Sequence, residues 1–385
     1  MKRYIFSCML FGLISLAGVT AFACLWDRDT LEMERQRFPT ALELITGKFL
    51  RHSPAFYQWR VQDRESRREA GSSPELLDDL AVAYEKTGKT DEAIRIMEEK
   101  ASKYPGLYET HANLGTFYIH AGRLTDGLVE IEKALEINPD AHFGRELYQK
   151  RLVEYLLSLG GEDQLSLPIS SDATAGMVPT GFGKFLLSRP ELTDSPEEQK
   201  NLLDDAIQGV LGMMKFGNHD SPILLEALAD LLLSHRYSVD AKQLASRAYL
   251  KASMESKNVQ EKDAYRNKAK ECLKFQTDGS KSNDELPFGV IASQFDAEIK
   301  DAEEWYSTIS GDEAAWLEQG INLDEAFEAK YYSDPAPVLK HPKRTFSSRI
   351  LGEQKVSSLS IGFAIAGILL IAAVVVFVRN RRSKL

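Results

Sequence analysis

Two consecutive stretches of 34 residues decide the fold: PELLDDLAVAYEKTGKTDEAIRIMEEKASKYPGL at residues 74–107 and YETHANLGTFYIHAGRLTDGLVEIEKALEINPDA at residues 108–141. The same residue types recur at one spacing, and the matching pairs are Leu80 and Leu114, Ala81 and Gly115, Tyr84 and Tyr118, Gly88 and Gly122, Ala93 and Gly127, and Pro105 and Pro139. A fixed period of this length is typical of helical repeats, whose units bury apolar faces on one another and leave a concave face for a partner. The two stretches therefore predict an all-α solenoid.

This pattern resembles the tetratricopeptide repeat (TPR) family, in which each repeat is a pair of antiparallel helices. The resemblance implies that Ala81 and Gly115 let the first helix approach the second, and that Tyr84 and Tyr118 fill the gap beside them. The other positions that match the family pattern are Leu80, Leu114, Ala93, Gly127, Ala134, Pro105 and Pro139.

Three residues depart from the family pattern. Lys100 stands where the pattern has a small residue, and Leu77 and His111 stand where it has tryptophan. We therefore expect the fold to be kept but the first repeat to be loosely packed.

A degenerate third unit is predicted at 222–254. Pro222 there takes the place of Pro74, and the residues that then fall on helix-contact positions are Leu225, Leu228, Ala229, Leu232, Ala241 and Ala248. Helix starts share the dipeptide Ser-Pro, at residues 53–54, 73–74, 195–196 and 221–222. Serine caps the free backbone N–H groups of a helix, and proline suits its first turn.

Hydrophobic segments flank the body. Lys2 and Arg3 precede an uncharged stretch that ends in Ala21-Phe22-Ala23, which is typical of a signal peptide cut after residue 23. Lipidation of Cys24 and an uncleaved anchor are the alternatives. Near the other end, residues 356–378 carry no charge and are followed by four basic residues. This segment is long enough to cross a bilayer, and the basic tail predicts a cytoplasmic end.

The charge of the body bears on its partners. Without the six basic residues of the two termini, 41 basic and 57 acidic side chains remain, a net charge of −16. No basic stripe offsets this charge, which argues against a nucleic-acid partner.

The expected organisation follows from these segments. We predict a signal peptide at 1–23, an N-terminal helical segment at 24–73, two repeats with a capping helix at 74–159, a linker at 160–180, a second helical region at 181–330, an extended stalk at 331–355, a transmembrane helix at 356–378 and a basic cytoplasmic tail at 379–385. In the second region we expect helices at 197–216, 222–235, 239–254, 258–275 and 291–308, with a shorter one near 312–330. Whether this region continues the solenoid or forms its own bundle is left open.

No catalytic, cofactor or metal-binding constellation emerges from the sequence. Gly181-Phe182-Gly183-Lys184 is similar to part of a phosphate-binding loop, but Val178 stands where that motif needs its first glycine. A flexible linker is the better interpretation of this stretch. Neither the zinc-binding motif His-Glu-x-x-His nor the nucleophile motif Gly-x-Ser-x-Gly occurs. We therefore do not expect an enzyme.

The resemblance implies that the first helix of each repeat lines the concave groove. The candidate partner-binding residues are Glu75, Asp78, Val82, Glu85, Glu109, Ala112, Asn113, Thr116, Ile119 and His120. The acidic members favour a basic or amphipathic protein or peptide segment. The alternative is that the chain's own N-terminal helices fill the groove.

The sequence thus predicts a single-pass membrane protein with an exported body that acts as a TPR-type interaction scaffold. The runner-up is an accessory or regulatory subunit of an envelope enzyme or transport complex, with its site in 181–330. The partner, the membrane, the compartment and the oligomeric state are left open by the sequence.

Overall fold

The computed structural model describes residues 25–35, 37–68, 71–139, 144–160, 165–171, 179–192, 195–235, 241–273 and 288–332. Across these ranges the chain forms helices and no strand, so the fold is all-α there. The helices are α1 (Arg28–Arg35), α2 (Ala41–Thr46), α3 (Pro54–Arg68), α4 (Pro74–Lys86), α5 (Thr90–Lys103), α6 (Tyr108–His120), α7 (Leu124–Ile137), α8 (Arg145–Ser158), α9 (Gly181–Leu187), α10 (Pro196–Phe216), α11 (Pro222–Ser234), α12 (Ala241–Glu255), α13 (Val259–Glu271), α14 (Phe288–Glu318) and α15 (Leu323–Tyr331).

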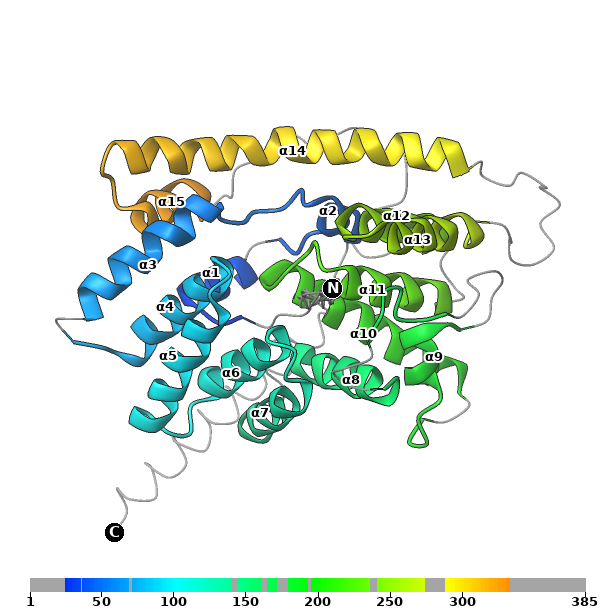
Figure 1. Cartoon of the computed structure of the whole chain (residues 1–385), viewed down its shortest axis with the longest axis horizontal. Coiled ribbons are helices and arrows are strands. Elements are labelled where there is room, and N and C mark those ends of the chain that lie inside the picture. The colour runs from blue at the N-terminus through cyan, green and yellow to red at the C-terminus, as the bar shows by residue number, and fades with distance from the viewer. Residues whose placement is uncertain are drawn as a thin grey trace, which may run out of the picture.

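The helices from α3 to α13 follow a curve, and α14 runs along its open side (Figure 1). Neighbours in the sequence pack on one another from α3 to α8, and again from α10 to α13, with α10 packed on α8. Helix α14 contacts α12, α2 and α3, and α15 packs on α14. Helices α1 and α2 lie inside the curve, where α1 contacts α4, and α2 contacts α10, α12 and α14. The body is thus a ring of helices that encloses its own N-terminal segment.

Serine and proline set the starts of the helices as the sequence predicts. The hydroxyl groups of Ser73, Ser195 and Ser221 each accept a hydrogen bond from the backbone N–H three residues later, and proline occupies the first turn of the helix. Helix α3 begins at Pro54, and Ser53 accepts a hydrogen bond from the N–H of Phe56 at 3.3 Å. The Ser-Pro prediction is confirmed at all four sites.

Glycine lets α6 and α7 approach closely. A Cβ atom built on Gly127 would lie 2.5 Å from Cγ1 of Ile119 and 2.8 Å from the carbonyl oxygen of Gly115. A Cβ atom on Gly115 would lie 2.8 Å from Cδ1 of Ile131. Larger residues at these positions would separate the two helices, because a close-packed interior leaves them no space.

The first repeat is tightly packed, so the expectation of loose packing is wrong. Leu77 is fully buried. Lys100 is also fully buried, and its Nζ lies 2.6 Å from both carboxylate oxygens of Asp78. The long side chain does not open the hairpin, because its charge is paired inside it. Among the repeat positions, Leu80, Ala81, Ala93, Leu114, Gly115, Tyr118, Gly127 and Ala134 are buried, Tyr84 is half-buried, and Pro105 and Pro139 are exposed.

One apolar core runs from the second repeat into the second helical region. It includes Ile131 of α7, Leu152 of α8, Val210 of α10, Leu228 of α11 and Phe295 of α14. Helix α8 packs on both α7 and α10, so it continues the stack of helices instead of capping it. The region after residue 180, which the sequence left open, shares the core of the repeats.

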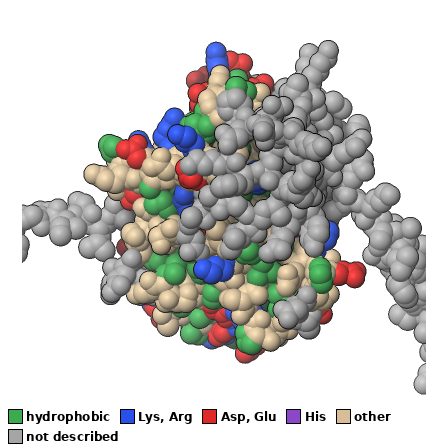
Figure 2. Space-filling model, turned by 90° about the vertical axis from the view of Figure 1, so that its right-hand side faces the viewer, with side chains coloured by type: hydrophobic (Ala, Val, Ile, Leu, Met, Phe, Trp, Pro, Cys, Tyr) green, Lys and Arg blue, Asp and Glu red, His purple; other side chains and the backbone are tan. Residues whose placement is uncertain are grey.

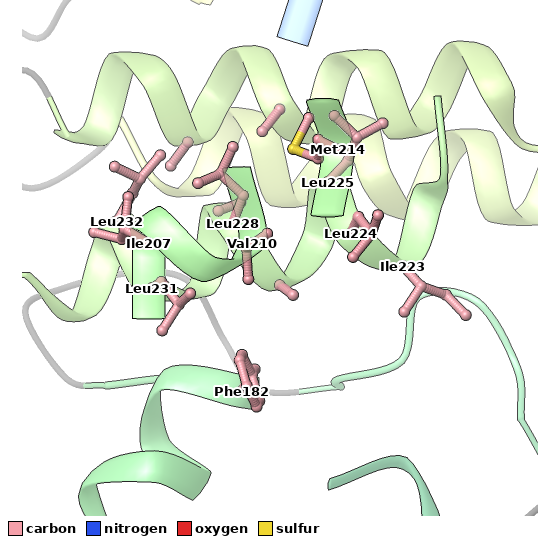
Figure 3. Packing of buried hydrophobic residues seen from close by; sticks show 14 of the residues in the cluster. Phe182, Ile207, Val210, Met214, Ile223, Leu224, Leu225, Leu228, Leu231 and Leu232 are labelled. Atoms are coloured by element: carbon pink, nitrogen blue, oxygen red, sulfur yellow. The ribbon is translucent and has the colours of Figure 1, made fainter. Parts of the chain in front are cut away.

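Helices α11 and α12 pack against each other as a hairpin. Figure 3 shows side chains of α11, among them Leu228 and Leu231, beside Ile207 and Val210 of α10, with Phe182 of α9 directed toward them. The six contact positions assigned to the degenerate unit are all buried: Leu225, Leu228, Ala229, Leu232, Ala241 and Ala248. Its membership in the TPR family stays a prediction.

The stretch that was interpreted as a flexible linker is instead the start of α9. Asp230 of α11 accepts a hydrogen bond from the N–H of Phe182 at 3.2 Å, and Glu226 accepts one from the N–H of Ile169 at 2.7 Å. A Cβ atom on Gly181 would lie 1.9 Å from Oδ2 of Asp230. These glycine-rich residues therefore serve close packing on α11.

Helix α14 is continuous, so the predicted break between 308 and 312 is wrong. Its buried residues are Ile291, Phe295, Ala302, Ile309 and Glu313, which form a single stripe along the helix. Gly311 lies in the expected break, but it faces open space and does not interrupt the helix.

The segments predicted to meet the membrane lie outside the described residues: the signal peptide at 1–23, Cys24, the transmembrane helix at 356–378 and the tail at 379–385. The predicted stalk at 331–355 also lies outside them, apart from its first two residues. Within the described ranges, none of the helices is both long and apolar enough to cross a bilayer.

A pair of glycine substitutions tests the close approach of α6 and α7. We expect Gly127→Ala to lower the free energy of unfolding by about 1–3 kcal/mol, because the added methyl group meets Ile119 and the backbone of Gly115. The matched control is Gly311→Ala, which adds a methyl group in open space and should stabilise α14 by about 0.5–1 kcal/mol. Urea denaturation of the full chain, followed by tryptophan fluorescence, measures both. Equal effects would contradict the packing argument.

Candidate functional site: the concave groove and its occupant

The groove residues predicted from the sequence lie together on α4 and α6, on the side that faces the N-terminal segment. Asp78, Val82, Ala112, Asn113, Thr116 and Ile119 are buried, Glu85, Glu109 and His120 are half-buried, and Glu75 is exposed. Most of this surface is therefore covered within the chain itself.

Part of the cover is the segment from Leu25 to Arg28, in which residues 25–27 are not helical and Arg28 begins α1. Neighbouring helices cover Thr116 and Ile119. The N–H of Trp26 donates to Oδ1 of Asn113 at 2.7 Å, and Nδ2 of Asn113 donates to the carbonyl oxygen of Trp26 at 2.9 Å. The N–H of Arg28 donates to Oδ1 of Asp79 at 3.0 Å. The groove thus contacts the main chain of this segment, as a peptide-binding groove does.

Two apolar side chains of the segment also contact the repeats. Leu25 is buried in the cluster that contains Leu77, Leu80 and Val82. The ring of Trp26 lies edge-on to that of Tyr108, with ring centroids 6.4 Å apart. The chain's own N-terminal segment thus contacts the groove, although the residues that do so precede α1 and are not the N-terminal helices that the alternative named.

Two of the predicted acidic groove residues have partners within the chain. Asp78 is paired with Lys100, and Glu85 with Nδ1 of His120. Burial raises the pKa of Asp78 to about 7, against the opposing effects of Lys100 and Asn113. These two carboxylates are therefore not free to attract a basic partner.

A buried group of charges holds the far end of the segment, and we call it the ionic clasp. It consists of Asp27, Asp29, His52, Arg60, Arg64, Asp79, Glu313 and Asp324. At its centre, the guanidinium group of Arg60 donates to Asp27 at 3.1 Å, to Asp29 at 2.5 Å and to Asp324 at 2.7 Å. Arg60 is fully buried. One side chain thus ties the N-terminal segment to α3 and α15.

Arg64 extends the clasp one turn along α3. Its Nε donates to Oδ2 of Asp79 at 3.0 Å, and its Nη2 pairs with Asp324. The spacing of four residues places Arg60 and Arg64 on one face of the helix. Asp324 lies in the first turn of α15, where the helix dipole favours a negative charge.

His52 joins the clasp to α14. Its Nδ1 lies 2.7 Å from Oε1 of Glu313, and its Nε2 lies 3.2 Å from Oδ2 of Asp29. A neutral imidazole has one N–H donor, so two carboxylate partners require the protonated ring. Burial by itself would lower the pKa of His52, but Asp29 and Glu313 outweigh it and raise that pKa.

The carboxylates of the clasp differ in their pKa values. Burial, together with the neighbouring Asp29, raises the pKa of Asp27 to about 6. Burial would also raise the pKa of Asp29 and Asp324, but the neighbouring cations together outweigh burial and lower both pKa values. These cations are Arg60 and His52 at Asp29, and Arg60 and Arg64 at Asp324. Arg60 therefore acts on both carboxylates.

Sequence reasoning missed the clasp. The only local signal is the spacing of Arg60 and Arg64 in a helix that was correctly expected. Their partners come from positions around 27, 79 and 324, which nothing in one sequence brings together.

Comparison of the chain with protein-family models, with curated proteins and with solved structures gave no match.

Removing one carboxylate from the clasp should be strongly destabilising. We expect Asp324→Asn to cost about 3–5 kcal/mol of unfolding free energy, because Arg60 and Arg64 stay buried with less opposing charge. The matched control is Glu328→Gln, four residues along α15, whose partner Arg28 is 39% exposed. This change should cost about 0–1 kcal/mol. Urea denaturation of both variants measures the difference, and similar costs would show that the clasp does not hold the fold.

The clasp also predicts a dependence on pH. The pKa of His52 is higher in the folded chain than its ordinary value of about 6.5, so folding gains stability from the protonated ring. This contribution is full below that ordinary value and is lost as the pH rises through the raised value. His52→Gln should remove this loss, so the stability difference between wild type and variant should shrink as the pH rises above about 6.5. Denaturation at a series of pH values checks it, and His111→Gln, outside the clasp, is the control. A difference that does not change with pH would contradict a protonated His52.

Proposed function

We propose that this protein is a membrane-anchored, extracytoplasmic scaffold whose helical repeats bind an extended segment of another protein. One observation carries the proposal: the groove of α4 and α6 holds residues 25–28 through their main chain. A surface that binds one segment through its main chain has the geometry to bind another.

The side chain of Asn113 makes two of the hydrogen bonds that hold the segment. Its amide oxygen accepts from the N–H of Trp26, its nitrogen donates to the carbonyl oxygen of the same residue, and this nitrogen also donates to Oδ1 of Asp78 at 3.2 Å. The bond to Asp78 stays when Trp26 leaves the groove, so it still orients the amide for another segment.

The arrangement of the described chain ends is compatible with the proposed membrane attachment. Arg28, close to the start of the described chain, pairs with Asp324 and Glu328 of α15, close to its end. The first and last segments of the chain that the structure describes therefore lie side by side.

The described part of the face in Figure 2 shows no other site of comparable definition. In Figure 2, hydrophobic, acidic and basic side chains lie in small mixed groups on the part of this face that is described. We therefore place partner binding in the groove.

Cross-linking tests the proposal. A photo-activated cross-linking residue is placed at Glu75 or Glu109, at the edge of the groove, in tagged full-length protein extracted with detergent. We expect a partner in near-equal amount, linked at these positions. The control is the same residue at Glu304 on α14, whose side chain is 71% exposed. Recovery of the protein alone, or equal linking at Glu304, would contradict binding in the groove.

A further inference from the structure

The side chains of the N-terminal segment indicate what kind of partner the groove accepts. This step rests on the proposed function, because a partner in the groove must replace residues 25–29. The groups that now contact these residues would then contact the partner.

The first two positions select apolar and aromatic side chains. Leu25 occupies the apolar cluster of the first repeat, together with Leu77 and Leu80. Trp26 packs edge-on against Tyr108, a geometry that favours an aromatic ring. The main chain of the segment is held in register by hydrogen bonds that select no side chain: Asn113 accepts from and donates to Trp26, and Asp79 accepts from the N–H of Arg28.

The third and fifth positions select acidic side chains. Asp27 and Asp29 both accept hydrogen bonds from Arg60, and Asp29 also faces the protonated ring of His52. Without these two carboxylates, Arg60 keeps Asp324 as its only paired carboxylate among the described residues. A buried guanidinium group with too little opposing charge is costly, so the ligand must supply the missing carboxylates.

A basic ligand would place its charges against Arg60 and His52. Asp78 and Glu85, which led the sequence to favour such a ligand, are already paired with Lys100 and His120. We therefore expect an acidic partner, whereas the sequence alone favoured a basic one.

We propose that the partner is an acidic segment of another protein, which binds by displacing residues 25–29. In order, it carries a large apolar residue, an aromatic residue, an acidic residue, a basic residue that pairs with Asp324 and Glu328 as Arg28 does, and a second acidic residue. The chain's own segment acts as a tethered competitor. Because tethering gives it an effective concentration of the order of millimolar, free peptide binds the intact protein poorly.

The test frees the segment without altering the groove. A recognition site for a specific protease is inserted at position 36 of the full chain, next to Arg37, whose side chain is 58% exposed. After cutting, a fluorescent peptide of residues 25–35 is added and its uptake is followed by fluorescence anisotropy. We expect uptake by the cut protein and little by the uncut protein.

Two comparisons test the chemistry of recognition. A peptide with Asp27→Lys and Asp29→Lys should bind at least about 100-fold more weakly, because each lysine opposes Arg60. Asn113→Ala in the protein should weaken uptake of the original peptide by about tenfold or more, because two main-chain hydrogen bonds are lost. Glu304→Gln on α14, outside the groove and 71% exposed at its side chain, should leave uptake unchanged.

Several results would overturn the proposal. These are equal or tighter binding of the lysine peptide, no uptake by a cut protein that keeps its helical circular dichroism, or a dimer in which two copies exchange residues 25–35. If the cut protein unfolds, the intact protein is tested by hydrogen exchange. Excess acidic peptide should then speed exchange at the N–H groups of Trp26 and Arg28, and no change would overturn the proposal.

These results are separable from those of the proposed function. If the protein takes up the acidic peptide but no partner is recovered from the membrane, the acidic ligand class stands and the scaffold function does not. If a cross-linked partner is held through a basic segment, the scaffold function stands and the acidic ligand class does not.

Discussion

The fold depends on a buried guanidinium group, that of Arg60, and on the three carboxylates around it. A charge this deeply buried is tolerated only when it is paired and hydrogen-bonded. Its partners Asp27, Asp29 and Asp324 belong to the first and last segments of the described chain. Arg60 can therefore be satisfied only when both segments have docked on α3. One local electrostatic requirement thus closes a ring built from residues almost 300 positions apart.

The sequence predicted the helices better than their assembly. The repeated pattern from Leu80 to Pro139 predicted the hairpins α4–α5 and α6–α7, because contacts between neighbouring helices leave a periodic trace. Lys100 shows where such reasoning stops: the pattern marked it as a flaw, whereas its Nζ is paired with Asp78 one helix away. The groove, too, was predicted only in part. Its positions were identified from the repeats, but the segment that occupies it was not, because contacts across 87 residues, as between Trp26 and Asn113, leave no local pattern.

The occupied groove and the ionic clasp are parts of one assembly. The segment that lies on Asn113 continues within a few residues to Asp27 and Asp29, and these reach Arg60 and His52. Displacing the segment from the groove therefore takes two carboxylates from the clasp. Glu313 then stays as the only charged partner of His52 among the described residues, so the contact between α14 and the loop before α3 is altered too. Occupancy of the groove and closure of the ring are coupled through shared charges.

The length of α14 follows from where the helix is attached to the ring. Over 31 residues it buries five side chains, so little of its surface contributes to the core. Its attachments lie at intervals along the ring: Glu298 pairs with Arg247 of α12, Asp301 with Lys48 after α2, and Glu313 with His52 before α3. A helix fastened by a narrow stripe and a few ion pairs can separate at one end while the other stays in place. The end of α14 that carries Glu313 contacts the clasp, so it is the end affected when the groove is emptied or filled. A partner that brings its own two carboxylates would satisfy Arg60 and keep the ring closed around it, whereas a partner without them would leave the ring open.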